Sequence, residues 1–91
     1  MVKIKNLHGT SDREPKNYDT WKEFWAAKMG YWPSYCSANY CCDSADVGAH
    51  VKKADSNDNR WYIVPLCYGC NKRADIFEVP EDDLVPVNNN D

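Results

Sequence analysis

The chain has 91 residues, a formal net charge of −3 and five cysteines. A domain of this size buries only about 60% of its unfolded surface, so its marginal apolar core needs support from disulfides or a metal. No apolar run approaches the roughly 18 residues that cross a membrane, so the composition argues against a membrane-spanning protein and for one small domain over residues 1–91.

Residues 1–35 are expected to form a strand and then a helix. Val2 and Ile4 alternate with lysines, a pattern that predicts a short edge strand with one apolar face. Residues 8–17 are rich in Gly, Ser, Asp and Pro, which predicts a loop.

An amphipathic helix is predicted to follow this loop. Thr20 and Glu23 form a T-x-x-E capping box, in which each side chain binds a backbone N–H at the helix start. Gly30 can adopt the left-handed conformation that ends a helix. Between these ends, apolar residues with helical spacing indicate the side that faces the core: Trp21, Phe24, Trp25 and Met29.

Two strands joined by a hairpin loop are predicted further along, at residues 47–53 and 60–66. Five turn-forming residues, 55–59, separate these two runs of β-formers. Residues 71–74 are expected to form a turn or two of helix.

The C-terminal part, residues 75–87, is expected to be extended. The short apolar runs at 76–79 and 84–87 are interrupted by Pro80 and by acids, which is typical of edge strands. Residues 88–91 are expected to fray.

Four cysteines form two pairs with the spacing of zinc-binding loops. Cys36 and Cys41 form C-x4-C, and Cys67 and Cys70 form C-x2-C. Tetrahedral Zn²⁺ takes four thiolates, and two short loops supply them with little loss of chain entropy. The 25 residues between the pairs suffice for a hairpin that lets the two loops meet. We therefore predict one structural Zn²⁺ held by these four cysteines.

Other interpretations of the cysteines remain open. Cys67 and Cys70 could form a redox pair, although thioredoxin-like sites occur in a βαβ context that the predicted elements lack. The thiols could also be buried apolar residues, which would leave their spacing to chance. Cys42 would make C-x5-C with Cys36, outside the usual spacing, so we interpret it as a free thiol and only an alternative ligand.

The expected compartment also favours a metal. The N-terminal residues contain no apolar stretch with a small-residue cleavage site, so no signal peptide is predicted. We therefore expect a cytoplasmic location, where stable disulfides are rare. An odd number of cysteines fits a complete disulfide set poorly.

The motifs within residues 36–74 occur in a known order. Cys36-x4-Cys41 is followed by Gly48-Ala49-His50-Val51 and then by YIVPLCYGCN at residues 62–71. This arrangement resembles the zinc-containing module of HNH (His-Me finger) nucleases. The resemblance implies a small α+β fold, a treble clef made of a zinc knuckle, a β-hairpin and a short helix, with the second cysteine pair at the helix start.

The resemblance also implies catalytic positions. In that family a histidine at the end of the first hairpin strand is the general base. The residue before it, and a His or Asn after the last zinc cysteine, bind a divalent metal. His50 matches the base and Asn71 a ligand of Mg²⁺, but Ala49 replaces the metal-binding Asp or His and Tyr62 replaces the middle Asn. Because a methyl group cannot coordinate a hard cation, the catalytic motif is degenerate.

Three interpretations of His50 stay open. It can be a structural residue, hydrogen-bonded across the hairpin or beneath the zinc loops. It can be the general base of an active nuclease, which would need its catalytic partners as well. It can also replace a cysteine as zinc ligand. Asn71 can likewise cap the helix start. A carboxylate such as Asp46 or Asp55 would have to reach in to replace the ligand missing at Ala49.

The charge distribution bears on the partner. Residues 1–77 carry 11 Lys/Arg against nine Asp/Glu, a net charge of +2, whereas residues 78–91 carry five acids and no base. In active relatives the hairpin and helix start enter the DNA groove, so the resemblance implies nucleic-acid contact through Lys52, Lys53, Arg60, Lys72 and Arg73. These residues can equally be ordinary solvated surface.

Three functions follow from these observations. The first is an HNH-like zinc module without catalytic activity that contacts nucleic acid. The second is a Mg²⁺-dependent DNA endonuclease with His50 as base. The third is a small adaptor or inhibitor of the kind that phages and mobile elements encode, which binds another protein through its acidic tail and through exposed aromatic residues such as Trp32, Tyr35 and Tyr40.

Overall fold

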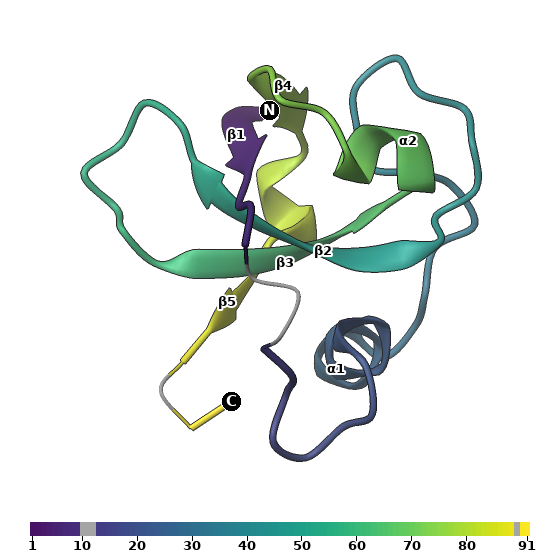
Figure 1. The fold of residues 1–91 in the computed structure, drawn as a ribbon. Helices are drawn as coiled ribbons and strands as arrows, with labels where there is room; N and C mark the ends of the chain where they lie inside the picture. Colours follow the sequence, from purple (N-terminus) through teal and green to yellow (C-terminus); the bar gives the residue numbers. More distant parts are fainter. Residues whose placement is uncertain (10–12, 89) are drawn as a thin grey trace.

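The computed structural model describes residues 1–9, 13–88 and 90–91. Its described part contains one antiparallel sheet in the order β4-β1-β2-β3-β5. Helix α1 lies on one face of the hairpin β2–β3 and the short helix α2 on the other (Figure 1). The elements are β1 (Val2–Asn6), α1 (Trp21–Met29), β2 (Val47–Lys53), β3 (Trp61–Leu66), α2 (Tyr68–Asn71), β4 (Phe77–Val79), the short 3-10 helix η1 (Glu81–Asp83) and β5 (Val85–Val87).

Two apolar layers pack on the central hairpin because successive side chains of a strand point to opposite faces. Ile63 belongs to the layer under α1, together with Trp21, Phe24, Trp25 and Val85. Ala49, Val51, Tyr62 and Val64 belong to the other layer, which also contains the buried cysteines. No helix in the described part has the length and apolar character needed to cross a membrane.

Helix α1 begins and ends where its capping residues predict. Thr20 Oγ1 accepts a hydrogen bond from the backbone N–H of Glu23 at 3.1 Å, and Gly30 takes the left-handed conformation with φ of 85°. The Glu23 carboxylate accepts from the N–H of Asp19 at 3.2 Å, one residue before the expected donor. Of the predicted apolar stripe, Met29 is half-buried and the other three residues are buried, so the prediction of this helix is confirmed.

The position predicted for the first strand is wrong. Strand β1 is not at the sheet edge, because it pairs with β2 on one side and with β4 on the other. Strands β4 and β5 form the edges, as predicted for the two C-terminal runs. Residues 13–17 of the predicted loop contain no helix or strand, and residues 10–12 lie outside the described part.

The second helix also differs from its prediction. It spans Tyr68–Asn71 rather than residues 71–74 and so begins three residues earlier than expected, because Cys67 is its cap. Asn71 is therefore the last helical residue and does not cap the helix start.

The C-terminal residue contacts the segment before α1. The carbonyl oxygen of Asp91 accepts a hydrogen bond from the N–H of Lys16 at 2.9 Å.

Candidate metal centre

The first cysteine pair lies on the long loop between α1 and β2. The loop closes on itself, since the N–H of Cys36 donates to the carbonyl of Asp43 at 2.8 Å and the N–H of Cys41 donates to that of Ala38 at 3.0 Å. Tyr40, directly before Cys41, has a φ of 66°. This left-handed turn reverses the chain and directs Cys41 back towards Cys36.

The second pair lies where β3 ends and α2 begins. Cys67 follows the last strand residue, and its Sγ accepts a hydrogen bond from the N–H of Cys70 at 3.3 Å. Thiol-capped turns of this kind place the two sulfurs on the same side of the turn. Cys70, within α2, is buried.

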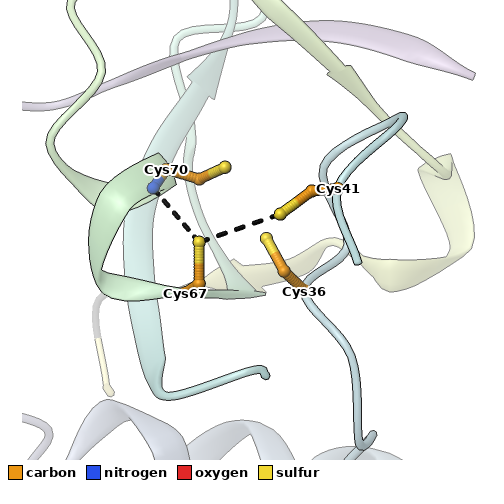
Figure 2. A group of neighbouring side chains, drawn as sticks. All are labelled: Cys36, Cys41, Cys67 and Cys70. Carbon is orange, nitrogen blue, oxygen red and sulfur yellow. Dashed lines mark hydrogen bonds between the residues drawn. The ribbon is translucent and has the colours of Figure 1, made fainter. Parts of the chain in front are cut away.

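The four thiols of Cys36, Cys41, Cys67 and Cys70 converge on one point. Their sulfur atoms all lie within 4.8 Å of one another, and Cys41 Sγ lies 3.9 Å from Cys67 Sγ. Figure 2 shows the side chains pointing towards one another, two from the loop and two from the start of α2. A tetrahedral ion with Zn–S bonds of about 2.3 Å would place its sulfurs about 3.8 Å apart. The cluster can therefore hold one metal ion.

Without a cation, these four thiols would not all be ionised. Burial raises the pKa of Cys36 and raises that of Cys70 to about 12. Burial acts in the same direction on Cys67, but hydrogen bonds from Cys70 and from neighbouring thiols outweigh it and lower the pKa of Cys67. Four thiolates at this spacing repel one another, and a divalent ion is what would allow all four to stay ionised.

Asn6 supports the second pair from strand β1, a role that the sequence analysis missed. Its side-chain amide donates to the carbonyl oxygens of Cys70 at 2.9 Å and Arg73 at 3.0 Å. Asn6 is buried. The signal was present in the sequence, since Asn6 continues the apolar positions Val2 and Ile4 of an alternating strand, where a polar residue needs partners.

Two alternative metal ligands lie outside this cluster. Cys42 is exposed, and all five cysteines are unbridged thiols. Neither Cys42 nor His50 belongs to the group of described residues that could hold a metal ion. Strand alternation explains the position of His50, because Ala49 faces the cysteine layer and His50 therefore faces α1.

His50 packs between two tryptophans. Its ring centroid lies 4.8 Å from that of Trp21 and 6.0 Å from that of Trp61, both in edge-to-face geometry. Its Nε2 is buried without a hydrogen-bond partner among the described residues, unlike the hydrogen-bonded structural histidine that we expected. Burial, together with the charge of Arg13, lowers the pKa of His50 to about 4, so the ring is neutral at pH 7.

His50 and Asn71 nevertheless border the same cavity. This cavity, of about 220 Å³, lies beside β2 where β1 has ended, and its other lining residues are Leu7, His8, Gly9, Gly48 and Ala49. Neither Asp46 nor Asp55 lines it. His8 is the additional polar side chain, and only the tertiary structure brings this residue from the N-terminal loop to the hairpin.

Most of the predicted cationic surface is neutralised by internal ion pairs. Arg60 pairs with Asp58 at 3.2 Å and Arg73 with Asp75 at 2.6 Å. Lys53 lies 3.3 Å from Glu81 and 3.9 Å from Asp58. Within the described part, Lys52 and Lys72 form no ion pair. Lys72 and Arg73 follow the end of α2 rather than its start.

Of the three aromatic residues predicted to be exposed, two are exposed and one is half-buried. Tyr35 and Tyr40 are exposed. Trp32 is half-buried, packs against Trp25 at a centroid distance of 5.5 Å, and donates from its indole N–H to the carbonyl of Ala45 at 3.1 Å. Trp32 is therefore part of the packing around α1.

Comparison of the chain with protein-family models, curated proteins and solved structures found no match. The relationship to HNH nucleases, and the treble-clef description of the fold, therefore stay predictions from the motifs within residues 36–74.

Proposed function

We propose that this protein is a zinc-stabilised binding module in which Cys36, Cys41, Cys67 and Cys70 hold one structural Zn²⁺. The convergence of four sulfurs within 4.8 Å is the observation that supports it. Catalytic zinc sites keep one coordination position for water or substrate, whereas structural sites fill all four with protein ligands. Four thiolates fill the coordination shell, so the ion has a folding role and leaves the surface to bind a partner.

Metal content and folding test the zinc site together. Purified protein should contain one zinc per chain by elemental analysis. Substitution with Co²⁺ should give the intense visible absorption of tetrahedral thiolate coordination. Cys36→Ser should lose the metal, whereas Cys42→Ser, which removes a thiol outside the cluster, should retain it. A metal-free sample that keeps a dispersed NMR spectrum after chelation would contradict the proposal.

The partner that we propose is nucleic acid, contacted by the hairpin and the segment after α2. The support comes from Lys52 and Lys72, which have no acidic partner within the described part. One partner in each ion pair of Arg60 and Arg73 is more than half exposed, Arg60 at 61% and Asp75 at 59%. Ion pairs that face solvent contribute little to stability, so phosphates can compete for these cations.

Salt dependence tests this contact. Affinity for a labelled DNA duplex should fall steeply between about 50 mM and about 200 mM salt. The double variant Lys52→Glu/Lys72→Glu should bind more weakly than Lys28→Glu/Lys22→Glu, which makes the same charge change on α1. Equal binding by the two variants would contradict the contact. A stoichiometric protein partner without nucleic-acid affinity would instead favour the adaptor function.

A metal-dependent nuclease is the second candidate, favoured by the cavity that His50 and Asn71 share. Its divalent ion would need oxygen or imidazole ligands, and Asn71 and His8 are the side chains of that cavity able to supply them. The test is nicking of supercoiled plasmid with Mg²⁺ or Mn²⁺, lost in His50→Ala and kept in Cys42→Ser. Absence of nicking by the wild type with both ions would remove this candidate.

A further inference from the structure

A second cavity, larger than the one beside His50, lies at the opposite end of β3 from the cysteine cluster. Its volume is about 420 Å³, and its lining residues are Arg13, Asn59, Arg60, Trp61, Val87 and Asn88. Trp61 begins β3 and Cys67 follows the end of that strand. At about 3.3 Å per strand residue, the two sites lie roughly 20 Å apart along the chain direction. The cavity is therefore separate from the candidate metal centre.

The cavity is built on an indole ring with a guanidinium beside it. Arg13 lies over Trp61, with its central carbon 5.0 Å from the ring centroid. The Arg13 backbone is tied to helix α1, because its carbonyl oxygen accepts a hydrogen bond from the indole N–H of Trp21 at 2.9 Å. Trp61 is fixed in turn by its pairing with Val87 in β5 and by the edge of His50.

A second guanidinium is also held in position. The Nε and Nη2 of Arg60 donate to the two carboxylate oxygens of Asp58, each at 3.2 Å. Asp58 additionally accepts from the hydroxyl of Tyr62, and Lys53 lies 3.9 Å away. Arg60 uses only its Nε and Nη2 for Asp58, and its side chain is 61% exposed, so its remaining guanidinium N–H groups can still donate to an anion.

These groups match the parts of one kind of ligand. Guanidinium groups bind phosphate with paired hydrogen bonds and keep their charge at any physiological pH. An indole ring, or a guanidinium plane, stacks with a flat heteroaromatic base. Carboxamides such as Asn59 and Asn88 offer a donor and an acceptor side by side, as the edge of a base requires. A simple carboxylate would use the arginines and leave the indole and carboxamides without a role.

We propose that this cavity binds a nucleotide, either free or as one unit of a single-stranded nucleic acid. Its phosphate would meet Arg13 and Arg60, and its base would stack on the Trp61–Arg13 pair. Binding of a single-stranded nucleic acid here rests on the nucleic-acid contact proposed above, and adds this cavity to Lys52 and Lys72 as a binding position. The free form does not rest on that contact.

Two probes distinguish the two sources of the ligand. Zinc-loaded protein would be titrated with AMP by calorimetry and with a labelled single-stranded oligonucleotide of about 12 nucleotides by fluorescence anisotropy. Arg13→Gln removes the charge over the indole. Lys28→Gln is the matched control, because Lys28 also lies over an aromatic ring, that of Phe24 at 5.6 Å, but is exposed and does not line the cavity. Trp61→Phe keeps a stacking ring, and Trp61→Leu removes it.

Binding of either probe should weaken about tenfold in Arg13→Gln and in Trp61→Leu, and less in Trp61→Phe and Lys28→Gln. Binding of AMP indicates a free nucleotide, and binding of the oligonucleotide alone indicates the polymer. The proposal is overturned if folded, zinc-loaded protein binds neither probe, or if Arg13→Gln and Lys28→Gln weaken binding equally. Oligonucleotide binding that depends on Lys52 and Lys72 but not on Arg13 would contradict nucleotide binding in this cavity. It would still support the nucleic-acid contact described under the proposed function.

Discussion

The backbone of helix α1 meets strand β2 at Gly48. A methyl group on Gly48 would lie 2.7 Å from the carbonyl carbon of Trp21 and 2.8 Å from the backbone nitrogen of Lys22. These are backbone atoms that no rotamer change can move, so a residue with a side chain would push the helix off the sheet. This close approach holds the first turn of α1 against β2 and so places Trp21 beside His50.

Gly48→Ala should therefore destabilise the protein. We expect a loss of about 1–3 kcal/mol in the free energy of unfolding, the usual effect of overpacking. Gly69→Ala is the matched control, because its added methyl group would meet only the Sγ of Cys67, at 3.9 Å. Urea denaturation of the zinc-loaded variants measures both. Equal midpoints for the two variants would show that the stability of the protein does not depend on the close packing of α1 against Gly48.

Tyr40 supplies a second test of backbone conformation. Its φ is 66° and its side chain is 98% exposed, so the ring contributes little packing to offset the left-handed geometry. Left-handed conformations cost residues with a Cβ roughly 1–2 kcal/mol. Tyr40→Gly should therefore be more stable than Tyr40→Ala by about 1 kcal/mol, since both lose the ring and only glycine loses the strain. Equal free energies of unfolding would contradict a left-handed turn before Cys41.

Asn6 connects strand β1 to the turn that carries Cys67 and Cys70. Asn6→Ala removes two hydrogen bonds to the carbonyls of Cys70 and Arg73, which should lower the free energy of unfolding by about 1–3 kcal/mol. Asn6→Asp should be worse, because a carboxylate cannot donate and would face those oxygens with a buried charge. Both variants should release zinc faster to a coloured chelator. An unchanged rate of zinc release would show that Asn6 stabilises the sheet without supporting the cysteine turn.

Short-range signals explain which elements could be predicted. Thr20, Gly30 and the apolar stripe between them fixed helix α1 because caps and periodicity are properties of neighbouring residues. The spacing within each cysteine pair and the hairpin between the pairs likewise made the cluster predictable. In contrast, the interior position of β1 depends on its pairing with β4, about 75 residues later in the chain, and no local signal predicts such a pairing.

The environment of His50 could not be predicted for the same reason. The motifs that resemble HNH nucleases cover residues 36–74, whereas Trp21, Arg13 and His8 come from segments outside that stretch. The cavity at Trp61 similarly combines the N-terminal segment, the hairpin loop and the end of β5. Sequence patterns predicted the cysteine frame that can hold a metal, and long-range packing determined what surrounds it.

The pKa of His50 gives a prediction for pH dependence. Burial and the charge of Arg13 lower this pKa from 6.5 to about 4, so the folded state holds the neutral ring. The unfolded state binds a proton as the pH falls through 6.5 and the folded state does not. The contribution of neutral His50 to the free energy of unfolding is therefore fully present above pH 6.5. It is lost progressively as the pH falls from 6.5 to 4. In His50→Gln, which cannot bind that proton, this part of the pH dependence should vanish.

Denaturation midpoints of wild type and His50→Gln, each measured at about pH 7.5 and about pH 5.5, test this prediction. The wild type should lose more stability on acidification than the variant, and comparison of the two cancels the acid lability of the thiolate cluster that they share. In the wild type, the His50 ring resonance should stay nearly constant over the same range. A resonance that titrates with a midpoint near 6.5 would place His50 in solvent, and the tryptophan pocket around it would then be wrong.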